Sequence, residues 1–92
     1  MLKVEFSSQF KKDYKLCIRR GCDPKQLEQV VTLLMQEQPL PEEYRDHALV
    51  NSRNYQNMRE CHLKPDWLLV YKVYQGILVL KLIRTGSHSD LF

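Results

Sequence analysis

The stretch WLLVYKVYQGILVLKLIR, residues 67–84, decides the fold. It consists of two strand-like apolar runs around a tight turn at Gln75 and Gly76, and a connection this short joins antiparallel strands. A third strand-like run precedes it and is joined to it through Pro65. The second half of the chain therefore predicts a three-stranded antiparallel meander, with strands at 56–63, 67–74 and 77–84.

Side-chain alternation in the last strand predicts which residues meet the rest of the molecule. Every second residue is a leucine, and we expect the helices to cover Leu78, Leu80 and Leu82. The residues expected to point the other way are Ile77, Val79 and Ile83. The same alternation places Arg84 with the leucines, where a charge is unfavourable. The strand is therefore expected to end or bulge at this residue.

The first half of the chain predicts a strand and a helix. LKVEF, residues 2–6, alternates like a short strand, and Ser7 or Ser8 can cap a helix start. Apolar residues then recur at i, i+4, i+7 and i+8, the spacing of a buried helical stripe, at Phe10, Tyr14, Cys17 and Ile18. Gly21 is expected to end this helix.

A second helix is expected to begin at Asp23 and Pro24. Aspartate is a favoured N-cap, proline is favoured at the first helical position, and Gln26 supplies the amide of a capping box. The buried face of this helix would comprise Leu27, Val30, Val31 and Leu34. Residues 41–55 are polar and are expected to form a long surface loop. The whole order predicts a small α+β domain over residues 1–92, with both helices on one face of a mainly antiparallel four-stranded sheet.

Composition narrows the class of protein. A chain of 92 residues with 43% hydrophobic and 27% charged residues is long enough for one globular core. The start of the chain does not resemble a signal peptide, and no apolar run reaches the roughly 18 residues of a membrane span, so a cytoplasmic protein is expected. Three cysteines without a CxxC pair predict reduced packing residues. The net charge is only +3, but basic side chains gather on the first predicted helix at Lys11, Lys12, Lys15, Arg19 and Arg20.

Side chains that suit acid–base chemistry occur in separate stretches that the meander could bring together. They comprise all three histidines, two arginines and a carboxylate: His47, His62, His88, Arg59, Arg84 and Asp66. RNA carries its own nucleophile, the 2′-OH, so its cleavage needs a base for that proton, an acid for the leaving 5′ oxygen and cations for the phosphorane. Histidine suits both proton transfers and arginine suits the phosphate. Aromatic residues that could stack on a base are Trp67, Tyr71 and Phe92.

Each of these residues also has an ordinary structural explanation. A single histidine is more often a surface or core residue than a catalyst. Arg59 and Glu60 could be an exposed strand pair, Trp67 could belong to the core, and the basic stripe could be a solvated helix face. A zinc site at Cys61 and His62 is disfavoured, because no second ligand pair has the spacing of a metal site.

Three segments, DHAL, RECHLKPDWLLVYK and RTGSHSDLF, in this order after two helices, resemble the YafQ branch of the RelE/ParE toxin superfamily. The resemblance covers essentially the whole chain. It implies the toxin half of a toxin–antitoxin pair, an mRNA interferase that cleaves the message in the ribosomal A site without a metal or other cofactor. The active-site set of the family falls on His47, His62, Asp66, Trp67, Arg84, His88 and Phe92, with Arg59 as an added phosphate contact.

The resemblance also implies a role for these residues. His88 would be the general acid, and Asp66 or His62 would be the base or the group that orients it. Arg84 would stabilise the charge of the phosphorane. The residues that position the message would be His47 and Phe92. The basic helix would contact the phosphates of ribosomal RNA.

A toxin of this kind implies an antitoxin partner. The antitoxin would be acidic and partly disordered when free, and would wrap the basic helix and the outer residues Ile77, Val79 and Ile83. The toxin is expected to be a monomer when free and part of a hetero-oligomer with its antitoxin.

The chain departs from the family pattern between its first two histidines. Asn51 and Asn57 stand at the glycine positions of the family, and Met58 replaces an aromatic residue. Asparagine tolerates left-handed backbone, so the turns are expected to persist.

Two other functions are open alternatives: a non-catalytic ParE-like inhibitor of DNA gyrase, and a small basic RNA-binding module. The gyrase inhibitor needs no proton-transfer groups at His62 and His88, and the RNA-binding module leaves the RTGSH ending unexplained, so the ribonuclease is favoured.

Overall fold

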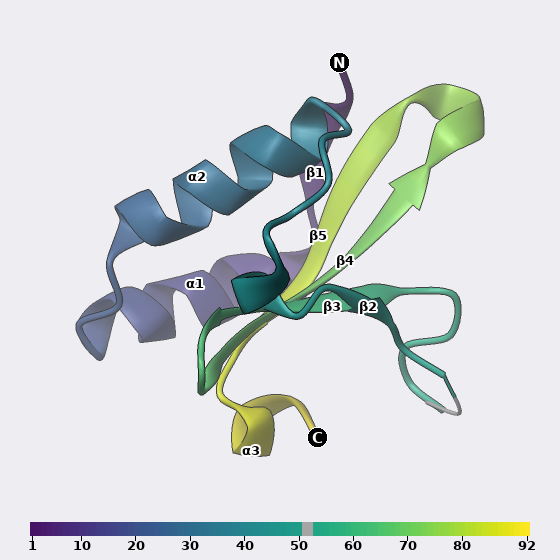
Figure 1. The fold of residues 1–92 in the computed structure, drawn as a ribbon. Coiled ribbons are helices and arrows are strands. Elements are labelled where there is room, and N and C mark those ends of the chain that lie inside the picture. The colour runs from purple at the N-terminus through teal and green to yellow at the C-terminus, as the bar shows by residue number, and fades with distance from the viewer. Residues whose placement is uncertain (51–52) are drawn as a thin grey trace.

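The structure, a computed structural model, describes residues 1–50 and 53–92. Two helices lie on one side of a twisted sheet, and a short C-terminal helix lies on the other side (Figure 1). The elements in chain order are β1 (Lys3–Phe6), α1 (Ser8–Arg19), α2 (Pro24–Met35), the 3₁₀ helix η1 (Glu42–Tyr44), β2 (His47–Ala48), β3 (Arg59–Lys64), β4 (Trp67–Tyr74), the 3₁₀ helix η2 (Gln75–Ile77), β5 (Val79–Gly86) and α3 (His88–Leu91).

The sheet order is β1-β5-β4-β3-β2, with β1 parallel to β5 and every other pair antiparallel. The predicted α+β class and the meander are confirmed, but the sheet has five strands instead of four. The added strand, β2, lies inside the stretch 41–55 that was predicted to be a loop. A strand of two residues is too short to show alternation, so only its pairing with β3 identifies it.

Both helix starts follow from their capping residues. The Ser7 hydroxyl accepts a hydrogen bond from the N–H of Phe10, and the Asp23 carboxylate accepts one from the N–H of Lys25. The predicted capping box at Gln26 is wrong, because its side chain instead donates to the carbonyl of Leu63 and ties α2 to β3. None of the helices in the described part of the chain is long and apolar enough to cross a membrane.

The connection between β4 and β5 differs from the predicted tight turn. It is the 3₁₀ helix η2, followed by Leu78 in left-handed conformation with φ 54°. The prediction that Leu78 faces the helices is wrong, because it is 55% exposed in this turn, whereas Leu80 and Leu82 lie in the core as expected. Apolar residues in the turn extended the strand pattern backwards, so the predicted strand started too early.

The predicted bulge near Arg84 is confirmed, although β5 continues beyond it to Gly86. Val70 pairs with Arg84 while Tyr71 pairs with Leu82, so Ile83 is the extra residue of β5. The bulge changes which way the following side chains point. At the strand exit, Gly86 has φ 155°, and a Cβ there would lie 2.9 Å from Oδ2 of Asp90. The close packing of α3 against the strand therefore requires glycine.

Two apolar clusters cover the two faces of the sheet. The larger one lies under α1 and α2 and includes Phe10, Val30, Cys61, Trp67, Leu69, Tyr71, Leu80 and Leu82. The smaller one lies on the opposite face and consists of Tyr55, Leu68, Val70 and Leu91, with Leu49, Met58 and Ile83 packed against it. The three cysteines are free thiols. Side chains that alternate along β3 are therefore divided between a helix-covered face and the face that carries α3.

Candidate active site

Glu60 and His62 point to the face of the sheet opposite α1 and α2, and His47 joins them from β2. His47 pairs with Glu60 across the strands, and Nε2 of His62 lies 3.2 Å from Oε1 of Glu60. Nε2 of His47 lies 3.7 Å from the same oxygen, and the two imidazole rings are 6.3 Å apart. Glu60 is only 5% exposed, so a nearly buried carboxylate stands between two histidines.

Backbone carbonyl groups fix the other side of each ring. Nδ1 of His47 lies 2.6 Å from the oxygen of Arg45, and Nδ1 of His62 lies 3.4 Å from the oxygen of Pro65. Arg45 has left-handed backbone, with φ 48°, where η1 turns into β2. A cavity of about 300 Å³ lies beside His62, and its lining includes Tyr44 and Lys64. This space is thus lined by His62 together with the basic residues Arg45 and Lys64.

The turn between β3 and β4 connects His62 to the C-terminal segment. Its Pro65 carbonyl faces His62, and Oδ1 of the next residue, Asp66, accepts a hydrogen bond from the backbone N–H of His88 at 3.0 Å. Asp66 therefore binds the backbone of His88, the first residue of α3, which carries the third imidazole. One turn therefore contacts two histidines that lie far apart in the sequence, His62 and His88.

The short helix α3 is fixed by its own cap and by α1. Ser87 and Asp90 form a reciprocal capping box, and Nη1 of Arg20 lies 2.8 Å from Oδ2 of Asp90. Hydrogen bonds from Ser87, together with Arg20, lower the pKa of Asp90. The ring of Phe92 lies 5.1 Å from that of His88 and is 50% exposed. An aromatic face is therefore available beside this imidazole.

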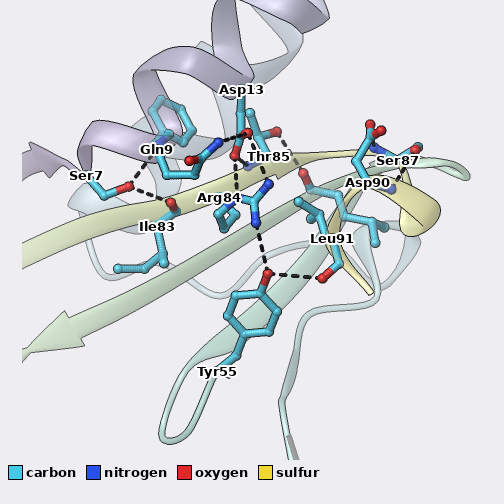
Figure 2. Close-up of polar contacts among 12 residues, drawn as sticks. Ser7, Gln9, Asp13, Tyr55, Ile83, Arg84, Thr85, Ser87, Asp90 and Leu91 are labelled. Carbon is cyan, nitrogen blue, oxygen red and sulfur yellow. Dashed lines mark hydrogen bonds and ion pairs between the residues drawn. The ribbon is translucent and has the colours of Figure 1, made fainter. Parts of the chain in front are cut away.

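Arg84 lies in a polar network between Asp13 of α1 and Tyr55 (Figure 2). Its Nε and Nη2 donate to the two oxygens of Asp13 at 2.7 and 3.2 Å, and its Nη1 donates to the hydroxyl of Tyr55 at 3.3 Å. That hydroxyl donates to the carbonyl of Leu91 at 3.0 Å. The hydrogen bonds from Arg84 to Asp13 raise the pKa of Arg84, so the guanidinium stays charged. Arg84 is thus tied to α1 on one side and to α3 on the other.

Two of the expected site residues are placed differently. Trp67 is 4% exposed, lies in the larger core cluster and donates from Nε1 to the hydroxyl of Thr85, so its ring is not open to a stacking base in this conformation. Tyr71, the other aromatic considered, is also buried. Arg59 lies two residues before Cys61 on β3 and therefore shares the helix-covered face with it. Its Nε and Nη2 donate to Asp46. The structure therefore does not group these three with the histidines.

The reading of Arg59 and Glu60 as an exposed pair is wrong. Glu60 is buried, and Asp46 binds Arg59 and also accepts from the Tyr71 hydroxyl. The hydrogen bond from Arg59 to Asp46 raises the pKa of Arg59, and burial is the largest cause of the raised pKa of Tyr71. Asp46 therefore fixes the strand pair β3 and β4 at its outer end.

Sequence reasoning missed Glu60, Asp13 and Tyr55 as members of the site. The spacing i, i+2 between Glu60 and His62 on a strand indicates a shared face, which was a usable signal. Asp13 lies at i+3 from Phe10 and i−4 from Cys17, so the apolar stripe of the helix already included it. Tyr55 gave no such signal, because the chain around it has no regular pattern.

The basic side chains of α1 are mostly exposed, but they differ in their contacts. Lys11, Lys12, Lys15 and Arg19 form no ion pair with any residue that the structure describes, whereas Arg20 is bound to Asp90. Lys11 and Lys15 also line an apolar groove of about 700 Å³ between α1 and α2, together with Phe6, Tyr14 and Val31.

The outer apolar residues expected to meet an antitoxin are not equally available. Ile77 is 70% exposed, but Val79 is 6% exposed and Ile83 packs against the smaller cluster. Asn57 has left-handed backbone with φ 61°, as expected for a glycine position of the family, while Asn51 lies outside the described residues. Met58 packs against the smaller cluster.

Within residues 1–50 and 53–92, no group of three or more histidine, cysteine or carboxylate side chains is arranged to hold a metal ion. Cys61 and His62 point to opposite faces of β3, since neighbouring side chains of a strand alternate. Burial raises the pKa of the Cys61 thiol to about 12.

The structure is a small α+β domain with histidines on the face of its sheet opposite α1 and α2. Comparison with known proteins shows that such a domain is a toxin of a type II toxin–antitoxin system. The family model for the bacterial toxin of the type II toxin–antitoxin system, YafQ, matches residues 2–92. The mRNA interferase toxin YafQ of Escherichia coli strain K12 is 40% identical over 90 residues, which cover 97% of this chain and 94% of that protein. The chain belongs to the YafQ family.

Solved structures extend the likeness to the whole fold. The crystal structure of a metal-bound toxin from Helicobacter pylori has a TM-score of 0.93 and 48% identity, and covers 100% of both chains. The toxin in the crystal structure of the E. coli DinJ–YafQ complex has a TM-score of 0.88 and 40% identity, and the match covers 100% of this chain and 99% of that one.

Proposed function

We propose that this chain is an mRNA interferase that cleaves messages bound to the ribosome, as the toxin of a toxin–antitoxin pair. The observation that supports this most is that the β3–β4 turn contacts both His62 and His88, through Pro65 and Asp66. The ring of His62 and the backbone of His88, from separate segments, are thereby held by one turn, which supports a site with one base and one acid. The name of the E. coli relative, an mRNA interferase toxin, agrees with this proposal.

In the proposed reaction His62 is the base and His88 is the acid. His62 keeps its Nε2–H on the Glu60 carboxylate and takes the proton of the 2′-OH at Nδ1, which exchanges its long 3.4 Å contact with the Pro65 oxygen for the message. The 2′ oxygen then bonds to phosphorus. The bond from phosphorus to the 5′ oxygen then breaks, and His88 gives a proton to that oxygen. The products are a 2′,3′-cyclic phosphate and a 5′-hydroxyl end. Each histidine finishes the step in the protonation state in which the other began.

The neighbouring groups support these two histidines. Glu60 orients the ring of His62, and Asp66 holds the backbone of His88. Arg84 stabilises the phosphorane through N–H groups that Asp13 and Tyr55 do not use. The proposed contacts to the message are His47 and Phe92, whereas Arg59 is bound to Asp46 on the helix-covered face. Trp67 contributes from the core by supporting Thr85 at the exit of β5.

The proposal includes two partners in the cytoplasm. The ribosome would meet the exposed basic side chains of α1, since phosphate contacts are additive and sensitive to salt. A cognate antitoxin, acidic and partly disordered when free, would bind the toxin and hold it in a hetero-oligomer. The toxin would be a monomer when free. The crystallised complex of the E. coli relative with DinJ supports such a partner.

The test is cleavage of a defined message on purified translating ribosomes. The wild-type protein should cut the message at the A-site codon, with no metal ion added beyond the Mg²⁺ that the ribosome itself needs. His88→Ala should lower the rate by about 100- to 10,000-fold, because general acid–base groups contribute on this scale. Ser89→Ala, an exposed neighbour in α3, should keep the wild-type rate.

Two results would replace the proposal. An intact message with arrested DNA replication would indicate an inhibitor of gyrase. Binding of ribosomes without any cut by the wild-type protein would indicate an RNA-binding module.

A further inference from the structure

Asp13 is a nearly buried carboxylate in the middle of a basic helix. It is 8% exposed, and α1 carries it between Phe10 and Cys17, which are both in the core. Its Oδ2 accepts hydrogen bonds from Nε of Arg84 at 2.7 Å and from the backbone N–H of Thr85 at 3.2 Å. Its Oδ1 accepts from Nη2 of Arg84 at 3.2 Å and from Nε2 of Gln9 at 3.0 Å (Figure 2).

These four hydrogen bonds use the whole accepting capacity of the group. A carboxylate has about four lone-pair sites, and each oxygen of Asp13 accepts two hydrogen bonds. Such a group has no site left for a substrate proton or for a phosphate ester. Its contribution to a reaction must therefore pass through the residues that donate to it.

Arg84 is the residue through which Asp13 can act. A guanidinium has five N–H groups in a fixed plane, and Asp13 binds two of them in parallel, which fixes the direction of that plane. The Tyr55 hydroxyl accepts from a third. Among the residues that the structure describes, the remaining two N–H groups of Arg84 have no acceptor, and the side chain is 24% exposed. Asp13 thus sets where these two donors point.

The same helix also holds the segment that carries His88. Asp13 binds the backbone of Thr85 before this histidine, and Arg20, the C-cap residue of α1, binds Asp90 after it. The two contacts lie on either side of the strand exit at Gly86. Helix α1 therefore fixes both the direction of Arg84 and the start of α3.

We propose that Asp13 is a positioning residue for RNA cleavage, which acts through Arg84 by orienting its free N–H groups toward the scissile phosphate. This proposal rests on the proposed function, because it assigns Asp13 to the same reaction. It distinguishes Asp13 from the lysines and arginines around it, which face solvent. Asp13 itself does not touch the message.

A double-mutant cycle on translating ribosomes tests the proposal. Asp13→Asn keeps the shape but loses the charge and one acceptor, so kcat should fall about 10- to 100-fold, as a small misplacement of a reacting group does. KM should change by less than about threefold, because binding at the other contacts is retained. In an Arg84→Gln background, adding Asp13→Asn should lower kcat no further. An equal loss in both backgrounds would overturn the proposal.

Two measurements separate positioning from mere loss of stability. Cys17→Ala removes a buried side chain from the same helix without contact to Arg84, and should lower the urea midpoint while keeping kcat. If Asp13→Asn alone does not fold, the double variant remains informative, because it leaves no buried charge unpaired. Its kcat should equal that of Arg84→Gln, and a lower value would overturn the proposal.

A measurement without RNA distinguishes this inference from the proposed function. The Nε–H proton of Arg84 should exchange with solvent at least about 10-fold more slowly in the wild-type protein than in Asp13→Asn, because the hydrogen bond protects it. Equal exchange rates would overturn the positioning role even if messages are cut. If the Nε–H exchange is slow but the protein cuts no message, then Asp13 does orient Arg84 and the proposed function is rejected.

Discussion

Nε2 of His62 lies 3.2 Å from the carboxylate of Glu60, and this carboxylate is only 5% exposed. The same oxygen also faces His47 at 3.7 Å. A buried charge of this kind is retained only when it has partners, and here both partners are imidazoles. Glu60 therefore fixes the direction of His62, and in the proposed reaction it would compensate the positive charge that this ring gains with the proton.

Replacing Glu60 with glutamine tests this relationship. Glu60→Gln keeps the size of the side chain but removes its charge, so the cleavage rate should fall at least about 10-fold, and by less than the roughly 100- to 10,000-fold expected for loss of His62 itself. The rate on translating ribosomes is the measurement. Glu5→Gln, on the exposed part of β1, is the matched control and should retain full activity. A fully active Glu60→Gln variant would remove Glu60 from the site.

The hydroxyl of Tyr55 joins Arg84 to the carbonyl of Leu91. Tyr55→Phe keeps the edge-on contact with Phe92 but removes both hydrogen bonds and leaves a carbonyl without its partner. The free energy of unfolding should fall by about 1–3 kcal/mol. Urea denaturation measures this change. Tyr14→Phe is the control, since the Tyr14 hydroxyl makes no hydrogen bond to the described part of the chain, and its unfolding should be almost unchanged.

Local signals in the sequence predicted much of the fold. Ser7 and Asp23 cap the helices as expected, Leu80 and Leu82 lie in the core, and the charge at Arg84 correctly indicated a bulge in β5. These features depend on residues close together in the chain. Helix caps, alternation and turn residues act within a few positions, so the sequence displays them directly.

The features that could not be predicted depend on pairing between distant segments. Asp13 and Arg84 are 71 positions apart, and neither pattern nor spacing indicates that they meet. Strand β2 exists only because His47 and Ala48 pair with β3. The sequence around Trp67 was equally compatible with a core and a surface position. In the structure its indole N–H donates to the buried Thr85 hydroxyl, so the residue belongs to the core. Proximity across a sheet follows from register, which a single sequence does not contain.

The buried thiol of Cys61 should make stability depend on pH above neutrality. Burial is the main cause that raises its pKa from 9.0 to about 12, with the charges of Asp46 and Glu60 adding to it. The unfolded chain therefore releases this proton at lower pH than the folded one. The contribution of the neutral thiol is fully present below pH 9.0 and is lost as pH rises toward 12.

Comparison with Cys61→Ala isolates this contribution. The difference in unfolding free energy between the wild-type protein and the variant should be constant from pH 7 to 8 and should shrink as pH rises above 9.0. The limiting slope is about 1.4 kcal/mol per pH unit for one proton. Urea titrations at several pH values measure it. A difference that stays constant up to pH 10.5 would contradict a raised pKa for this thiol.

The neighbouring residues Arg19 and Arg20 should differ in their contribution to ribosome binding. Arg19 is exposed and forms no ion pair within the described residues, whereas Arg20 is already bound to Asp90. A free cation that neutralises a phosphate releases a counterion, so Arg19→Gln should reduce the slope of log K against log salt by about 0.7–0.9. Arg20→Gln should reduce the slope less, because its charge is shared with a carboxylate. Binding to ribosomes at several salt concentrations measures both slopes. Lys3→Gln, on the edge strand β1, should leave the slope unchanged. Equal reductions for Lys3, Arg19 and Arg20 would show that α1 has no specific contact with ribosomal RNA.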